Sequence, residues 1–473
     1  MLFDYWIITL LIISLPIYFR LSARWQNVFL IAASYIFYGY WEQRFLVLMI
    51  LSTLVNYYLS LKLHSSESLT GRKLTLLMSL IYNLGLLGYF KYYNFFTASF
   101  LAAFQSVGFA ISVPVVHLIL PLGISYYTFK VIGYLIDIYR GDQKPTDILS
   151  FGLFVGYFPE VAAGPIGRAH SFLPQIYRKR HFTKEQIAAG LQLILLGYVK
   201  KVAIAEAVSA QVNPLFANPE NFKTLDLLCG MYLFALQIYG DFSGYTDIVR
   251  GISKLLGIDI INNFRQPYLS RNIGEFWKRW HVSLSTWLRD YLYIPLGGNR
   301  KGASRTAWNL MATMLLCGLW HGASWAFVGW GGLHGIYLLV SRYIGDTRGG
   351  SNRNDQEGQS IARRILSVAV TFHLVSFAWI FFRDGELTVA SRYVTSLLDI
   401  ARLGYTSRSL ILLTIFYMSF VLLMDLLTRR GNEEVLAVAG SPWIVRSAAY
   451  VCLILIVSFL GAPSVQPFIY FRF

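Results

Sequence analysis

Two histidines in the stretch from Phe276 to His321 have the residue type and setting for acid–base chemistry. His281 lies in a segment rich in tryptophan and arginine, and His321 follows forty positions later inside a long uncharged run. A neutral imidazole can accept a proton from an attacking hydroxyl and release it again near neutral pH. The other interpretation of each residue is a buried histidine that is hydrogen-bonded for packing alone.

The run around His321 is too long for one straight membrane helix. No charged residue occurs between Arg305 and Arg342, and at 1.5 Å per residue such a helix would be roughly 50 Å long, against ~30 Å of hydrocarbon. We therefore predict a break at Gly322–Ser324 or at Gly329–Gly332. Irregular backbone at membrane depth is tolerated where protein or a water-filled cavity satisfies it, so we expect a cavity beside His321. Small residues are expected to leave room there for a substrate: Gly318, Gly322, Ala323 and Ser324.

The segment around His281 has the pattern of an amphipathic helix. Apolar side chains and His281 recur at steps of three and four residues from Trp277 to Leu292, and Lys278, Arg279 and Arg289 fall on the other side. This pattern predicts an interfacial helix that lies along the membrane plane. Its expected N-cap is Asn272 or Gly274, and Pro295, Gly297 and Gly298 are expected to end it.

Two roles remain open for each group of residues on that helix. His281 either anchors the helix against the bundle or points into the same cavity as His321. Lys278, Arg279 and Arg289 either attract the phosphates of a donor or anchor the helix at the membrane surface.

Two further segments carry acidic residues in apolar surroundings, where a carboxylate is costly unless it is paired. In QIYGDFSGYTDI, Asp241 either orients a catalytic histidine or pairs with an arginine, and Asp247 follows it. In YFPEVAAGPIGR, Glu160 precedes small residues, which predicts a loop or broken helix lining the cavity, or a plain turn. We expect His334 and His373 to be structural.

Composition sets the class of protein. The chain has 473 residues, of which 55% are hydrophobic and 14% charged, against about 25% charged in soluble domains. The net charge of +16 comes from cations in short loops between apolar runs, which is typical of the positive-inside bias and not of a nucleic-acid-binding protein. The three cysteines have no ligand-like spacing, so neither a disulfide framework nor a metal site is expected.

These patterns predict an all-α polytopic membrane protein with ten to thirteen membrane segments in one domain, residues 1–473. The first apolar run, Trp6–Phe19, has Asp4 before it and no cleavage pattern after it, so we predict a first span and not a signal peptide. Asp346–Arg364 is the best candidate for a flexible loop. Walker, dinucleotide and nucleophile-elbow motifs are absent from the sequence.

Four segments in combination resemble the membrane-bound O-acyltransferase (MBOAT) superfamily, and its bacterial branch of alginate O-acetylation and teichoic-acid D-alanylation proteins most of all. They are YFPEVAAGPI, QIYGDFSGYTDI, the segment from NFRQPYLSRNIGEFWKRWHVSLSTW to PLGGNR, and CGLWHGASW, which together span Tyr157 to Trp325. SYIFYGYW and FKVIGYLIDIYRG extend the likeness toward the N-terminus.

The resemblance implies a ring of spanning helices around a thin core, with cytoplasmic and periplasmic funnels that meet near the catalytic histidine. His321 matches that histidine, and His281 matches the second signature position, which is asparagine or aspartate in other branches. Family members transfer an acyl group to a hydroxyl. Those that modify polysaccharides act with a periplasmic partner, here expected to be an SGNH-hydrolase-like acetyltransferase.

The leading hypothesis is a multi-pass O-acetyltransferase of the bacterial inner membrane. Acetyl-CoA is the expected donor substrate and an exported or cell-surface polysaccharide the expected acceptor, with no permanently bound cofactor. His321 would be the base, His281 would assist, and Asp241 would orient or polarise. The alternatives are transfer of D-alanyl or another acyl group, and a transporter, since broken helices and membrane histidines also mark transport paths.

Overall fold

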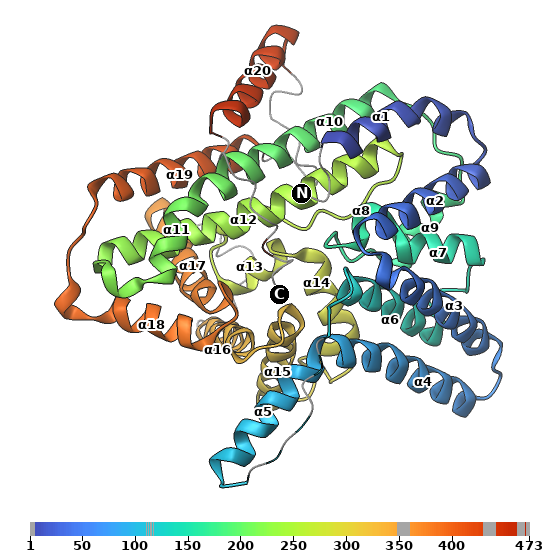
Figure 1. The fold of residues 1–473 in the computed structure, drawn as a ribbon, viewed down its shortest axis with the longest axis horizontal. Coiled ribbons are helices and arrows are strands. Elements are labelled where there is room, and N and C mark those ends of the chain that lie inside the picture. Colours follow the sequence, from blue (N-terminus) through green and yellow to red (C-terminus); the bar gives the residue numbers. More distant parts are fainter. Residues whose placement is uncertain are drawn as a thin grey trace. The chain divides into compact units, whose positions relative to one another are not determined.

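The structure is a computed structural model that describes residues 5–347 other than 110, 112, 114, 115 and 117, together with residues 360–428, 441–460 and 469. Every regular element in these ranges is a helix, which confirms the predicted all-α fold (Figure 1). Contacts between Cα atoms divide the chain into two compact units, described separately below. Unit 1 is Met1–Leu2, Leu191–Gly251 and Asn262–Phe473, and unit 2 is Phe3–Gly190 and Ile252–Ile261.

Unit 2 contains the N-terminal helices. They are α1 (Tyr5–Arg20), α2 (Ala23–Trp41), α3 (Gln43–Ser65), α4 (Leu69–Leu87), α5 (Tyr93–Ser106), α6 (Ile124–Arg140), α7 (Ile148–Gly156), α8 (Phe158–Val161) and α9 (Ala169–Ile176), with a π-helical turn at Gly88–Tyr92 that joins α4 to α5. Polar pairs hold this unit together inside its apolar core, as is common between membrane helices. Asn56 of α3 and Asn83 of α4 exchange side-chain hydrogen bonds of 3.1 and 2.7 Å.

Glu160, one of the predicted acidic residues, belongs to unit 2. It lies on the short helix α8 and forms an ion pair of 2.7 Å with Lys130 of α6, and both side chains are buried. The segment is a broken helix, because α8 is separate from α7 and α9, and its place in the lining of a cavity stays a prediction. Its carboxylate is neutralised locally, which is how a buried charge is tolerated.

Unit 1 contains the remaining helices and both candidate catalytic histidines. The boundary with unit 2 falls within α10 (Lys184–Tyr198) and near the end of α12 (Thr224–Leu255). The other helices are α11 (Ala207–Ala217), α13 (Ile273–Arg279), α14 (Val282–Leu288), α15 (Ala303–His321), α16 (Trp325–Thr347), α17 (Ile361–Phe382), α18 (Leu387–Leu398), α19 (Arg408–Leu427) and α20 (Trp443–Leu460). Short 3₁₀ turns lie at Pro219–Asn221, Pro267–Leu269 and Ile400–Arg402, and π-helical segments at Val199–Glu206 and Arg289–Tyr293.

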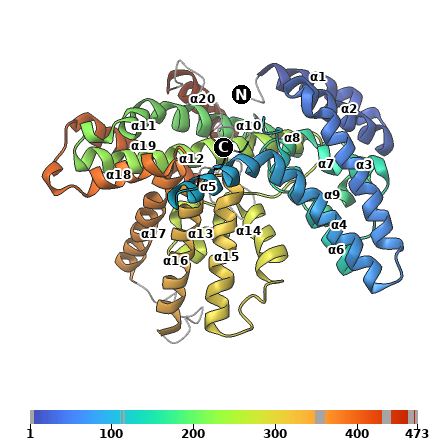
Figure 2. The same cartoon turned by 60° about the horizontal axis from the view of Figure 1, so that its bottom comes forward.

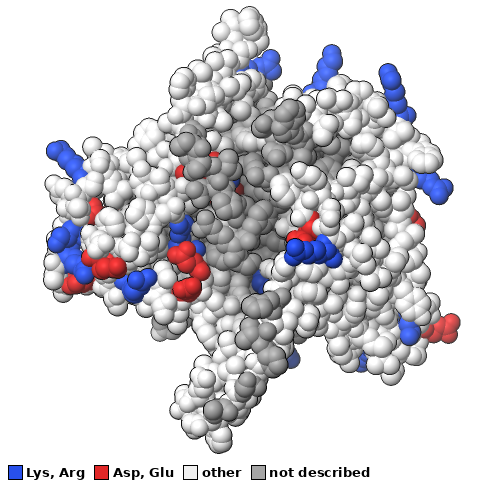
Figure 3. All heavy atoms as spheres, viewed as in Figure 1, with Lys and Arg blue, Asp and Glu red and all other residues white. Residues whose placement is uncertain are grey.

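In the part of the chain that the structure describes, six helical stretches are long and apolar enough to cross a membrane, which confirms a multi-pass membrane protein. They are Gln43–Ser65, Leu69–Ser106, Lys184–Ala217, Ile361–Phe382, Arg408–Leu427 and Trp443–Leu460. On the face drawn in Figure 3, charged side chains are few and scattered over a largely uncharged surface. The number of ten to thirteen segments and the single domain stay predictions. Residues 348–359 of the predicted flexible loop lie outside the described residues.

Candidate active site

The segment that carries His281 is not one helix. Asn272 caps α13 by accepting a hydrogen bond of 2.9 Å from the backbone N–H of Glu275, which confirms the first predicted cap. However, α13 ends at Arg279 and α14 begins only at Val282. His281 lies between them in the left-handed region, with φ of 43°. The prediction of one continuous interfacial helix is therefore wrong, because the helix is interrupted at Trp280 and His281.

An irregular segment earlier in the chain explains this break. The carbonyl of Arg279 accepts a hydrogen bond of 2.9 Å from the N–H of Arg265, and the N–H of Val282 donates one of 3.1 Å to the carbonyl of Asn263. The Asn263 side chain also accepts from the N–H of Ser283 at 3.0 Å. Backbone groups that would continue the helix are thus bonded to Asn263–Arg265. A pattern of side chains cannot reveal such partners, because the helical spacing persists on both sides of the break.

The uncharged run breaks beside His321, at the first of the two predicted places. His321 is the last residue of α15, Gly322 is extended with φ of −158°, and α16 begins at Trp325. Gly329–Gly332, the second predicted place, lies inside α16. As the last residue of a helix, His321 lies at the negative end of the helix dipole, which stabilises a positive charge there by about 0.3–1 kcal/mol.

Two of the four small residues near His321, Gly318 and Gly322, serve helix packing, whereas room for a substrate beside Ala323 and Ser324 stays a prediction. A Cβ on Gly318 would lie 2.1 Å from the carbonyl oxygen of Phe327, and one on Gly322 would lie 2.1 Å from the Phe327 ring. A Cβ on Gly331 would lie 2.2 Å from the carbonyl oxygen of Met314. The absence of these Cβ atoms lets α15 and α16 pack side by side (Figure 1 and Figure 2).

The structure brings His281 and His321 together. Their ring centroids are 6.2 Å apart with an interplanar angle of 65°, and both side chains are buried. Aromatic rings surround the pair. Phe242 of α12 lies 4.9 Å from His281, and Trp330 and Phe382 each lie 5.1 Å from His321. Two imidazoles from distant parts of the chain therefore meet in an aromatic enclosure.

The protonation state of His281 follows from its burial. It lies between two short helices, outside the six candidate spans, and it is fully buried. Loss of solvation lowers the pKa of His281 to about 3, so its ring is neutral at physiological pH. A neutral ring carries one N–H donor and one acceptor nitrogen.

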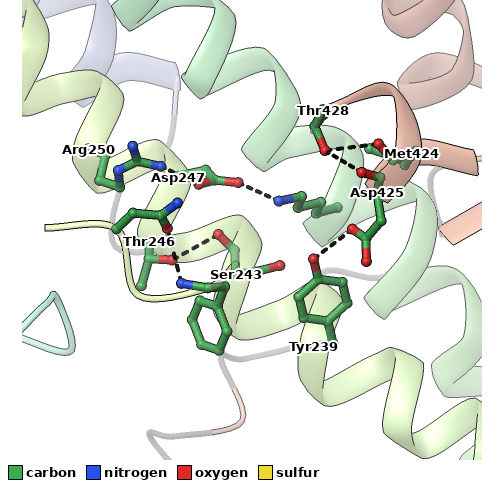
Figure 4. Close-up of polar contacts among 11 residues, drawn as sticks. Tyr239, Ser243, Thr246, Asp247, Arg250, Met424, Asp425 and Thr428 are labelled. Carbon is green, nitrogen blue, oxygen red and sulfur yellow. Dashed lines mark hydrogen bonds and ion pairs between the residues drawn. The ribbon is translucent and has the colours of Figure 1, made fainter. Parts of the chain in front are cut away.

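Asp241 and Asp247 of α12 are paired with lysines. Asp241 lies 2.6 Å from Lys201 and accepts a hydrogen bond of 2.7 Å from the backbone N–H of Ile469. Asp247 lies 2.7 Å from Lys200 and 3.3 Å from Arg250 (Figure 4). Asp241 thus pairs with a lysine, where one of its two interpretations had an arginine, and Asp247 pairs with both a lysine and an arginine.

Sequence reasoning missed the buried cations of the segment Val199–Glu206. Lys200 and Lys201 are each 3% exposed, although they lie inside the candidate span Lys184–Ala217. The signal was present, because two adjacent lysines in an apolar run of that length require partners at membrane depth.

The three basic residues proposed for donor binding remain near the surface. Lys278 is exposed at the end of α13. Arg279 is half-buried and forms an ion pair of 2.5 Å with Glu275, and the Arg289 side chain is 60% exposed and lies 2.7 Å from Asp290. Their phosphate-binding role stays a prediction.

One cavity of about 730 Å³ opens elsewhere in unit 1, between α12, α17 and α19. Its lining includes Tyr268, Phe372 and Asp425 and neither of the two histidines. Asp425 accepts a hydrogen bond of 2.8 Å from Tyr239 (Figure 4). The cavity predicted beside His321 stays a prediction.

Comparison with known proteins identifies the family. Residues 31–349 match the profile of the membrane-bound O-acyltransferase family. The chain is 38% identical to the "Probable alginate O-acetylase AlgI" of Pseudomonas putida over 98% of this chain and 97% of that protein. It is 33% identical to the "Peptidoglycan O-acetyltransferase" of Helicobacter pylori over 96% and 94% of the two chains.

A more distant relative is the "Teichoic acid D-alanyltransferase" of Bacillus subtilis, 30% identical over 56% of this chain and 69% of that protein. The matched residues 31–349 contain both histidines of the pair and cover more than half of the chain. The protein is therefore an acyltransferase that belongs to the membrane-bound O-acyltransferase family.

Proposed function

We propose that this protein is an O-acetyltransferase of the bacterial inner membrane that serves the acetylation of an exported or cell-surface polysaccharide. The observation that carries the proposal is the pair of buried imidazoles, His281 and His321, with centroids 6.2 Å apart. The similarity to an alginate O-acetylase over nearly the whole of both chains supports this acceptor class. The peptidoglycan O-acetyltransferase, at 33% identity, supports transfer to a carbohydrate hydroxyl more generally.

In the proposed reaction the donor is acetyl-CoA, which reaches the pair from the cytoplasm. The acceptor oxygen bonds to the acetyl carbonyl carbon while His321 takes the hydroxyl proton. The C–S bond of the thioester then breaks, and the imidazolium returns the proton to the departing thiolate. General acid–base catalysis of this kind contributes about 10²–10⁴-fold.

The surroundings of His321 suit the proton transfer. Its position at the end of α15 stabilises the imidazolium through the helix dipole. His281 is neutral and can donate a hydrogen bond to the carbonyl oxygen of the acetyl group as negative charge develops there. In this scheme Asp241 acts through α12, and Lys278, Arg279 and Arg289 attract the donor's phosphates.

Donor and polymer lie on opposite sides of the membrane in this proposal. The acetyl group therefore has to leave the pair toward the periplasm, where an SGNH-hydrolase-like acetyltransferase would complete delivery to the polymer. The first acceptor hydroxyl then belongs either to that partner or to the polysaccharide.

The test measures O-acetyl groups on the exported polysaccharide of cells that carry His321→Ala or His281→Ala in place of the wild type. We expect acetylation to fall at least about 10²-fold for His321→Ala, the lower bound for a lost acid–base group. Membrane insertion of each variant is confirmed by immunoblot. Wild-type acetylation in a stably inserted His321→Ala strain would refute the proposal.

A second experiment separates acetyl from D-alanyl transfer. The purified protein is given either radiolabelled acetyl-CoA or a radiolabelled D-alanyl thioester, and the label transferred to the acceptor is measured. Transfer from the D-alanyl donor alone would favour the activity of the Bacillus subtilis relative.

A further inference from the structure

Six of the buried charged side chains in unit 1 lie on two segments that contact each other. They are Lys200, Lys201, Glu206, Asp241, Asp247 and Arg250. Three come from the π-helical segment Val199–Glu206 and three from α12, and three are positive and three negative. Charges at membrane depth are costly even when paired. π-Helical segments inside longer helices also occur frequently at functional sites, so the cluster is a candidate for a role in catalysis.

Glycines bring α12 into backbone contact with the π-helical segment on both sides of Asp241. A Cβ on Gly240 would lie 2.8 Å from the carbonyl oxygen of Lys200, and one on Gly244 would lie 2.9 Å from the backbone nitrogen of Lys201. The two backbones are thus held as closely as glycine allows. The turn of α12 at Asp241 is therefore positioned directly by the segment that carries Lys201.

Lys201 contacts one carboxylate of this turn and one of its own π-helical segment. Its Nζ lies 2.6 Å from Asp241 and 3.4 Å from Glu206. Asp241 also accepts the backbone N–H of Ile469 at 2.7 Å. The pair thus connects three segments that are far apart in sequence.

The turn leads directly to the histidine pair. Phe242 follows Asp241 in sequence, it is fully buried, and its ring lies 4.9 Å from His281 at an interplanar angle of 80°. His281 itself adopts the left-handed conformation, with φ of 43°. Such backbone costs about 1–3 kcal/mol and persists only where the surroundings impose it. The ring of Phe242 is one of the contacts of the His281 side chain that this conformation presents.

We propose that Lys201 is a positioning residue for the acyl-transfer site: by holding Asp241 it fixes the turn of α12 that places Phe242 against His281. This inference rests on the proposed function in assigning catalysis to the histidine pair. The neighbouring pair Lys200–Asp247 is equally buried, but Asp247 lies nearly two helical turns after Asp241 on α12. A substitution in that pair is therefore a control for the loss of a buried charge.

The experiment uses the full-length, detergent-solubilised protein with Lys201→Met/Asp241→Asn. The double substitution removes both charges of the pair together, but it also removes the contact of 3.4 Å between Lys201 and the buried Glu206. Asp241→Asn alone keeps Lys201 beside Glu206, so it is measured as well, and a loss confined to the double variant would overturn the proposal because it would follow from Glu206. The control is Lys200→Met, which removes the adjacent buried lysine and leaves Asp247 with Arg250 at 3.3 Å.

We expect the double variant to lose turnover by at least about tenfold with an unchanged KM for the donor, because a 1 Å misplacement costs up to ~10²-fold in rate. The control is expected to keep turnover within about twofold, because Asp247 retains a partner. Wild-type turnover in the double variant would show that the pair serves folding alone and would overturn the proposal. An equal loss in the control would overturn it too, because the effect would then follow from any lost buried charge.

A second measurement does not depend on catalysis. Diethyl pyrocarbonate labelling of His281, followed by peptide mass spectrometry, reports whether its enclosure has opened, and His170 of α9, which is exposed and lies outside the candidate spans, is the internal reference. We expect faster labelling of His281 in the double variant and wild-type labelling in the control. Unchanged labelling would refute the positioning role. Faster labelling in a protein whose wild type transfers no acyl group would keep that role and refute the proposed function.

Discussion

Gly331 and Gly332 are adjacent residues of α16, but the structure predicts different effects of an alanine substitution at the two positions. A Cβ on Gly331 would lie 2.2 Å from the carbonyl oxygen of Met314 on α15, whereas one on Gly332 would lie 3.5 Å from a side-chain methyl of Leu315. The first is a clash with backbone, and the second is ordinary van der Waals contact. Alanine at either position also gains up to about 1 kcal/mol of helix propensity.

The expected losses of stability and turnover in Gly331→Ala follow from the clash. To bring the new Cβ of Gly331→Ala from 2.2 Å to an ordinary contact, α15 and α16 have to separate by about 1 Å, and overpacking of this kind costs about 1–3 kcal/mol. His321 ends α15, and the Trp330 ring beside Gly331 packs on it at 5.1 Å. A displacement of about 1 Å at a reacting group lowers the rate by up to ~10²-fold.

The assay compares Gly331→Ala with Gly332→Ala in purified protein. Thermal unfolding is followed by intrinsic tryptophan fluorescence, and acyl transfer by release of free thiol from the donor. We expect a lower unfolding temperature and up to ~10²-fold lower turnover for Gly331→Ala, and wild-type values within about twofold for Gly332→Ala. Equal behaviour of the two variants would refute the reasoning, because it would mean that close packing of α15 on α16 does not position His321.

Two further predictions concern the pH dependence and the donor. Because burial lowers the pKa of His281 to about 3, the residue stays neutral from roughly pH 5 to 8. A His281→Asn variant is therefore expected to keep the acid limb of the wild-type pH–rate profile at the same pH. A displaced limb would show that His281 titrates in this range. Arg289, 60% exposed beside Asp290, is expected to contribute to donor affinity, so Arg289→Gln should raise KM up to about fivefold, since an exposed ionic contact is worth about 0.2–1 kcal/mol. That increase should shrink at high salt, and an unchanged KM would assign Arg289 to anchoring at the membrane surface.

The break of the uncharged run shows what spacing alone can predict. The number of uncharged residues between Arg305 and Arg342 is too large for a single spanning helix, so a break was predictable from the length of the run. Gly322–Ser324 was one of two predicted places for it. The choice between the places depended on packing. Gly331 lies inside α16 and permits its close approach to α15, and the break falls at Gly322.

The helix around His281 shows where the spacing misleads. Apolar residues recur at helical steps across Trp280 and His281, yet the backbone leaves the helix because Asn263 and Arg265 bond to it. Those partners lie about fifteen to twenty residues earlier in the chain, and no local pattern encodes them. The same limit applies to Asp241, whose lysine partner lies forty residues away in another helix.

The sequence by itself determined the all-α membrane class, the candidate histidines and the buried carboxylates that require partners. Each of these follows from composition or from the cost of placing a polar group in hydrocarbon, which depends on residue type and immediate surroundings. Only the tertiary structure decided that His281 and His321 lie 6.2 Å apart, that glycines close α15 onto α16, and that Lys201 holds Asp241. These are contacts between segments far apart in the chain, where the packing of whole helices determines which side chains meet.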